Sequence, residues 1–209
     1  MCFSATASFI AGTALSAAGV ITLKKAETKR EIPFAAIPLL FGIQQVFEGF
    51  VWLSFSSGNP AMNSLFAHAF LFFAYVLWPI FIPFSAGLLE TDISRKKLLS
   101  VFQVAGIGVG MYLFYFMFSH SVISQVVNKS ITYSISIPYP FAVVSLYVLV
   151  TCGSLLFSSH KTIKLFGILA SISFAIAYYF YTVAFASVWC FFAAILSIVI
   201  YWYFRRGVV

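Results

Sequence analysis

The stretch FGIQQVFEGFVW, residues 41–52, sets two amides and a carboxyl group in a run that otherwise suits a lipid bilayer. Apolar residues continue on both sides, from Ile32 to Phe55, which exceeds the roughly 20 residues needed to cross the hydrocarbon core. Backbone groups in lipid must be hydrogen-bonded within their own segment, so the stretch predicts a transmembrane helix. The question is why such a helix carries Glu48.

The whole chain has this apolar character. Of its 209 residues, 62% are hydrophobic and 8% are charged, and the mean hydropathy is +1.03. A soluble domain would contain about 25% charged residues. The composition therefore predicts a single integral membrane domain over residues 1–209, with the lipid bilayer as its partner and no soluble domain.

Charged and turn residues divide the chain into seven apolar segments, each long enough to cross a membrane as a helix. The fold class predicted is thus all-α, an integral membrane bundle of seven transmembrane helices. The predicted spans are residues 4–23, 32–55, 64–89, 98–119, 139–157, 165–185 and 187–204.

The distribution of basic residues predicts the orientation of the bundle. Eleven of the twelve Lys and Arg residues fall in alternate loops or at the C-terminus, and only Lys129 falls on the other side. The positive-inside rule then places the N-terminus outside and the C-terminus in the cytoplasm. These loops also account for the net charge of +7, so no nucleic-acid partner is expected.

Glu48 shares one face of its helix with other polar side chains. Gln44 precedes it by four residues, Gln45 by three, and Trp52 follows it by four, which are the spacings of neighbours on a helix. An ionisable residue inside a membrane faces the bundle interior or an aqueous cavity and marks a candidate functional site. The pattern predicts a site for a ligand or a proton; a purely structural carboxyl group is the alternative.

Further reactive residues fall at the same outer depth when the spans follow this topology. His68 and Tyr181 extend the predicted ligand site. Zinc or copper is a possible cofactor, since Cys and His suit these metals, although no two candidates have helical ligand spacing. A Cys2–Cys190 disulfide and a set of unconnected helix ends are the alternatives. The candidate metal ligands are Cys2, His68, His120 and Cys190.

Two other patterns carry structural predictions. Gly106 and Gly110 form a GxxxG step, which predicts close helix packing. SITYSISI, residues 130–137, alternates Ser or Thr with apolar residues, so a short hairpin turning at Asn128 and Lys129 is expected, as a flap over the site or as a surface feature. Every lysine lies in a loop, so no Schiff base with retinal is expected.

Several motifs resemble a bacterial family of small multi-pass membrane proteins of unknown function. They are MCFSATASF at residues 1–9, QQVFEGFVW at 44–52, WPIFIP at 78–83 and WCFFAA at 189–194. The resemblance covers most of the chain. It implies a shared seven-helix fold, and the bacterial inner membrane as the location, without implying an activity.

The residues themselves favour a transporter or binding protein for a small polar or cationic solute, with an outward-facing pocket around Glu48. An intramembrane enzyme using Glu48 and His68, with or without a metal, is the second hypothesis. A structural or sensory protein is the third. The sequence predicts neither the identity of the ligand nor the oligomeric state.

Overall fold

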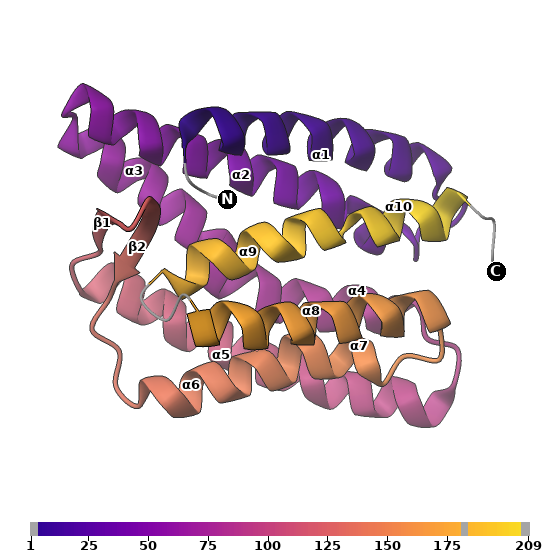
Figure 1. Cartoon of the computed structure of the whole chain (residues 1–209). Coiled ribbons are helices and arrows are strands. Elements are labelled where there is room, and N and C mark those ends of the chain that lie inside the picture. The colour runs from indigo at the N-terminus through magenta and orange to yellow at the C-terminus, as the bar shows by residue number, and fades with distance from the viewer. Residues whose placement is uncertain (1–3, 181–183, 206–209) are drawn as a thin grey trace.

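The computed structural model describes residues 4–180 and 184–205, which form a bundle of helices with a small hairpin at one end (Figure 1). The helices are α1 (Ala5–Lys25), α2 (Ile32–Ser57), α3 (Pro60–Leu71), α4 (Trp78–Leu89), α5 (Ile93–Ser119), α6 (Pro140–Val148), α7 (Ser154–Leu156), α8 (Lys161–Phe180), α9 (Phe185–Leu196) and α10 (Ile198–Arg205). Two π-helical turns, η1 (Phe72–Leu77) and η2 (Leu149–Gly153), join α3 to α4 and α6 to α7.

These elements merge into seven helical segments that overlap the predicted spans with shifted ends, and residues 181–183 of the span predicted over 165–185 lie outside the described residues. Six of the segments within the described ranges are long and apolar enough to cross a membrane. The seventh, residues Pro140–Leu156, is apolar but shorter. The protein is therefore a multi-pass membrane protein that is all-α apart from the short hairpin. A crossing by the shorter segment stays a prediction.

The loops gather at two opposite ends of the bundle (Figure 1). One end holds the α1–α2, α4–α5 and α7–α8 connections and the end of α10; the other holds the hairpin and the start of α9. The segments rich in Lys and Arg therefore lie at one end of the bundle, called the basic end below. Arg206 lies outside the described residues. The described members of this end are Lys24, Lys25, Lys29, Arg30, Arg95, Lys96, Lys97, Lys161, Lys164 and Arg205.

A buried carboxylate joins two of the loops at the basic end. Glu90, 3% exposed, accepts hydrogen bonds of 2.7 Å from both the backbone N–H and the hydroxyl of Ser159. It also accepts bonds of 3.1 Å from the N–H groups of Thr91 and Asp92. Burial raises the pKa of Glu90, but these hydrogen bonds outweigh it and leave the pKa below its ordinary value. Glu90 is therefore a charged structural group that fastens the α4–α5 connection to the start of α8.

The GxxxG step of α5 packs against α4, as the sequence predicts. A Cβ atom added at Gly106 would lie 1.9 Å from the carbonyl oxygen of Pro79, and one at Gly110 would lie 2.9 Å from the Ile80 side chain. Such distances leave no room for any side chain at Gly106. The two helices therefore touch backbone to backbone, which is how small residues stabilise helix pairs in a bilayer.

The predicted hairpin is also present. Strands β1 (Ile123–Val127) and β2 (Ser130–Ser134) pair antiparallel, with Val127 opposite Ser130. Asn128 and Lys129, the two turn residues, have φ values of 50° and 59°, as two-residue hairpin turns require. Residues 130–133 of β2 are buried, and the Tyr133 ring stacks on Phe70 of α3 at 4.9 Å. The hairpin therefore packs against the helices through β2 and is more than a surface feature.

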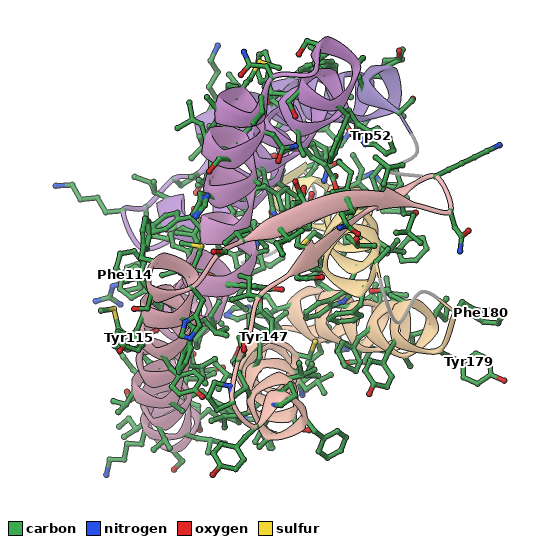
Figure 2. The ribbon with its side chains drawn as sticks, turned by 90° about the vertical axis from the view of Figure 1, so that its left-hand side faces the viewer. Trp52, Phe114, Tyr115, Tyr147, Tyr179 and Phe180 are labelled. Atoms are coloured by element: carbon green, nitrogen blue, oxygen red, sulfur yellow. The ribbon has the colours of Figure 1, made fainter. Side chains whose placement is uncertain are left out.

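A chain of hydrogen bonds holds β1 to the neighbouring helix ends. The Ser124 hydroxyl donates to Asn63 Oδ1 at 2.5 Å, and Asn63 Nδ2 donates to the Ser54 hydroxyl at 2.8 Å. Ser54 belongs to the last turns of α2, the helix that carries Glu48. Figure 2 shows the hairpin crossing this end of the bundle near Trp52, whereas Tyr179 and Phe180 of α8 point outward.

Candidate functional site

Gln44, Gln45 and Glu48 form the polar face of α2, and all three are 0% exposed. Trp52, one turn further toward the hairpin, is half-buried. The face is therefore turned into the bundle and is closed to solvent in this conformation. An opening from this cluster toward the hairpin end stays a prediction.

Two residues from other helices bind this face directly. The Ser187 hydroxyl of α9 donates a hydrogen bond to Glu48 Oε1. The Trp78 indole N–H, at the start of α4, donates to Gln44 Oε1 at 2.8 Å, and its ring stacks on Phe41 at 3.9 Å. The polar cluster, defined here as Gln44, Gln45, Glu48, Trp78 and Ser187, thus lies where α2, α4 and α9 meet.

Several amide groups of the cluster lack hydrogen bonds among the described residues. Gln45 makes none through either Nε2 or Oε1, and Gln44 makes none through Nε2. The indole Nε1 of Trp52 also lacks a hydrogen bond among the described residues. A buried polar group without a partner costs about 1–3 kcal/mol, so an unsatisfied amide in a native interior usually marks a bound water, an ion or a functional role.

Two π-helical turns are linked through Tyr147 of α6, and η1 directly precedes Trp78 of the cluster. In η1 the shifted hydrogen-bond pattern leaves the Ala74 carbonyl to accept a 2.5 Å bond from the Tyr147 hydroxyl of α6. The Tyr147 carbonyl in turn accepts a 2.8 Å bond from Thr151 in η2. Pro79 cannot donate to the Tyr75 carbonyl four residues earlier, which favours the irregular turn at this point. π-helical turns are frequent at functional sites.

Cys190 of α9 belongs to the surroundings of the cluster. It is 5% exposed, lies beside the Gln44 side chain and is within electrostatic range of Glu48. Cys152 is buried in the η2 turn. Cys2 and Tyr181 lie outside the described residues, so the structure tests neither a Cys2–Cys190 disulfide nor a role for Tyr181.

The two predicted outer histidines are engaged elsewhere. His68 Nδ1 contacts the Ser64 carbonyl oxygen at 2.7 Å, and its ring lies 5.8 Å from that of Phe118. His120, at the exposed end of α5, stacks on Phe116 at 5.2 Å. Among the residues described, no three His, Cys, Asp or Glu side chains converge as a metal site would require. The zinc or copper set therefore gains no geometric support here.

The sequence predicts the polar face of α2 but not the residues of other helices that form hydrogen bonds with it. Ser187 and Trp78 belong to apolar segments in which one serine or one tryptophan has no pattern to distinguish it. The one available signal was the spacing of Pro79 and Pro83, which marks α4 as irregular. Helix-to-helix pairing cannot be read from the sequence of one helix.

The fold and the site together define a multi-pass helical membrane protein with a polar cluster buried between α2, α4 and α9. The chain matches a family of unknown function, DUF6629, over residues 1–208, and it belongs to that family. No curated protein and no solved structure matches it. Family membership agrees with the resemblance in the sequence motifs and brings no activity with it.

Proposed function

We propose that the protein binds a small cationic solute within the membrane, with Glu48 as its ionic partner, and that it carries this solute across the bilayer. The observation that supports this most directly is Gln45. Its amide is fully buried beside Glu48, and neither of its polar atoms has a hydrogen-bond partner among the described residues. A ligand that bonds to this amide would recover the desolvation cost of about 1–3 kcal/mol.

The donors and acceptors of the cluster indicate the kind of solute. Gln44 Nε2, Gln45 Nε2 and Trp52 Nε1 can donate, and Gln45 Oε1 can accept. The Glu48 carboxylate, which receives the hydrogen bond from Ser187, is a second acceptor. A protonated amine supplies donors to the two acceptors and balances the charge of Glu48. Methylammonium is the simplest molecule of this class and serves as the probe below.

Gln45→Leu separates a binding role from a structural one. We expect this variant to be as stable as the wild type, or more stable by about 1 kcal/mol, because leucine removes an unsatisfied amide at similar volume. We also expect it to lose most methylammonium binding. Thermal unfolding and calorimetric titration of the purified protein in detergent measure the two effects.

Gln103→Leu is the matched control. Gln103 lies on α5, outside the polar cluster, and its Oε1 is also buried without a hydrogen bond in the part of the chain that the structure describes. It should retain methylammonium binding. Equal binding by wild type and Gln45→Leu would contradict the proposed site, and uptake of methylammonium into proteoliposomes tests transport separately from binding.

Orientation is part of the proposal. The basic end faces the cytoplasm, the N-terminus and the hairpin face outward, and the membrane is the inner membrane of a bacterium. An odd number of crossings places the two termini on opposite sides, and in this proposal all seven segments cross. A reporter fused after Arg206 should be cytoplasmic, and one inserted at Asn128 should be external. If both reporters lie on the same side, one of the segments between them does not cross the membrane. The short Pro140–Leu156 segment would be the first candidate.

The enzymatic alternative required Glu48 and His68 to act together. The contacts of His68 that the structure describes are with Ser64 and Phe118, so a reaction centre shared by His68 and Glu48 stays a hypothesis.

A further inference from the structure

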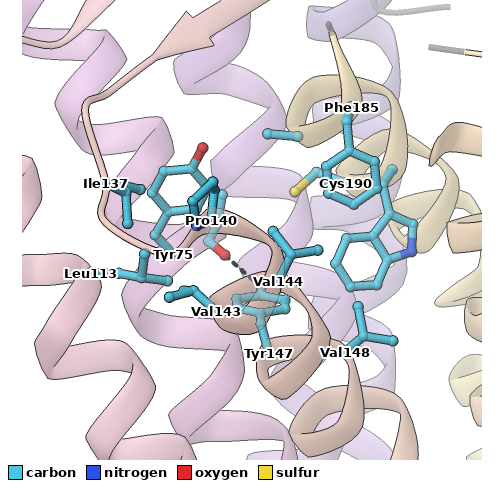
Figure 3. A pocket seen from close by; sticks show the side chains of 13 residues that line it. Tyr75, Leu113, Ile137, Pro140, Val143, Val144, Tyr147, Val148, Phe185 and Cys190 are labelled. Atoms are coloured by element: carbon cyan, nitrogen blue, oxygen red, sulfur yellow. Dashed lines mark hydrogen bonds between the residues drawn. The ribbon is translucent and has the colours of Figure 1, made fainter. Parts of the chain in front are cut away.

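An apolar cavity of about 90 Å³ lies beside the polar cluster, between η1, α6 and the start of α9 (Figure 3). A single water molecule needs a cavity volume of roughly 10–15 Å³, so this cavity has room for a group of several atoms. Its walls are almost entirely carbon. The residues that line it include Tyr75, Val143, Val144, Phe185, Trp189 and Cys190.

A second cavity, of about 40 Å³, continues from the first toward the centre of the bundle. Tyr147, Trp189 and Cys190 line both cavities. The inner cavity is also lined by Trp78, whose indole N–H binds Gln44. A single apolar cavity of about 150 Å³ takes up benzene, and the two cavities here, with three wall residues in common, measure about 90 and 40 Å³.

Cys190 connects the cavities to the polar cluster. It forms part of both cavity walls and lies beside Gln44 and within electrostatic range of Glu48. A ligand whose apolar part occupies the cavities would therefore have its polar end close to the only acidic residue inside the described spans. The aromatic rings of Trp189 and Phe185, which stack at 5.5 Å, are suited to an aromatic group of the ligand in the cavity.

The outer wall of the cavity is weakly held. Tyr147 is the one buried residue of α6, and its hydroxyl bond to Ala74 fixes that helix to η1. Val143 and Val144 are half-buried, and Pro140 is exposed. Few buried contacts allow a segment to open at low cost, so α6 is suited to admit a ligand from the bilayer.

We infer that the solute of the polar cluster is an amphiphilic amine, whose apolar group enters these cavities from the lipid while its ammonium group meets Glu48. This rests on the proposed function and narrows its substrate class. The probes are methylammonium and benzylammonium, which share a charged group and differ by an aromatic ring. Benzyl alcohol serves as the uncharged analogue of the second.

The expected result is that wild-type protein binds benzylammonium about tenfold more tightly than methylammonium, because the ring is removed from water. Val144→Phe fills the cavity and should abolish this difference by weakening benzylammonium alone, and Ala186→Leu on α9 should act in the same direction from the opposite wall. Ala142→Phe, on an exposed position of α6 outside the cavity lining, should preserve the difference.

Each remaining outcome has a defined meaning. Retained methylammonium binding shows that a cavity variant is folded. If methylammonium binds and benzylammonium binds no more tightly, the inference fails and the proposed function stands. If benzyl alcohol binds as tightly as benzylammonium, or the cavity variants leave the tenfold difference intact, the amphiphilic amine is the wrong class. If neither amine binds, the inference and the proposed function fail together.

Discussion

Gly106→Ala is expected to lower the free energy of unfolding by about 3 kcal/mol or more, the upper part of the range for overpacked interiors. The added methyl group would lie 1.9 Å from the carbonyl oxygen of Pro79. That oxygen cannot move away easily, because it belongs to the backbone of α4. It faces α5 because Pro83, four residues later, has no N–H with which to hold it in the helical pattern. The proline that frees the carbonyl and the glycine that makes room for it thus act as a pair.

Gly108→Ala is the matched control, two residues away on the same helix. Nothing lies within 4 Å of a Cβ atom added at Gly108, and the position is exposed. Alanine there should be neutral or stabilise α5 by up to about 1 kcal/mol, since glycine is the poorer helix former. Thermal unfolding of both variants in the same detergent measures the contrast. Equal melting temperatures for Gly106→Ala and Gly108→Ala would show that α4 and α5 are not in backbone contact.

The sequence was sufficient to predict the helical segments because hydrophobic length and loop charge determine where a chain can cross a bilayer. The hairpin turn at Asn128 and Lys129 was predicted for a similarly local reason, since both residues must adopt positive φ. The polar face of α2 followed from helical spacing alone. These are properties of one segment and its immediate neighbours.

The rest of the site depends on how segments pair, which local patterns do not specify. Ser187 reaches Glu48 from a position 139 residues later in the chain, and Tyr147 reaches Ala74 across 73 residues. Depth in the membrane places His68 with Glu48, because both lie in the hairpin-side half of their helices. Depth does not specify rotation about the helix axis, and in the structure His68 lies toward Phe118 on α5.

Glu48→Gln is expected to fold normally and to lose methylammonium affinity by about 100-fold, corresponding to about 3 kcal/mol, a loss typical when one member of a buried charge pair is removed. Glutamine keeps an oxygen that can accept the hydrogen bond from Ser187, so the contact between α2 and α9 survives. Glu48→Ala should lose the affinity and also about 1–3 kcal/mol of stability, because it removes the hydrogen bond between α2 and α9 and leaves a gap at a fully buried position.

The dependence on pH distinguishes a carboxylate that binds a cation from a carboxyl group that only packs. Protonation of Glu48 removes the charge that binds methylammonium, so any loss of wild-type binding on acidification should be absent from the residual binding of Glu48→Gln. Calorimetric titration of the two proteins from about pH 8 down to about pH 5 makes this comparison. Wild-type affinity in Glu48→Gln across that range would leave Glu48 a packing role alone, because glutamine keeps the shape of the side chain and cannot carry its charge.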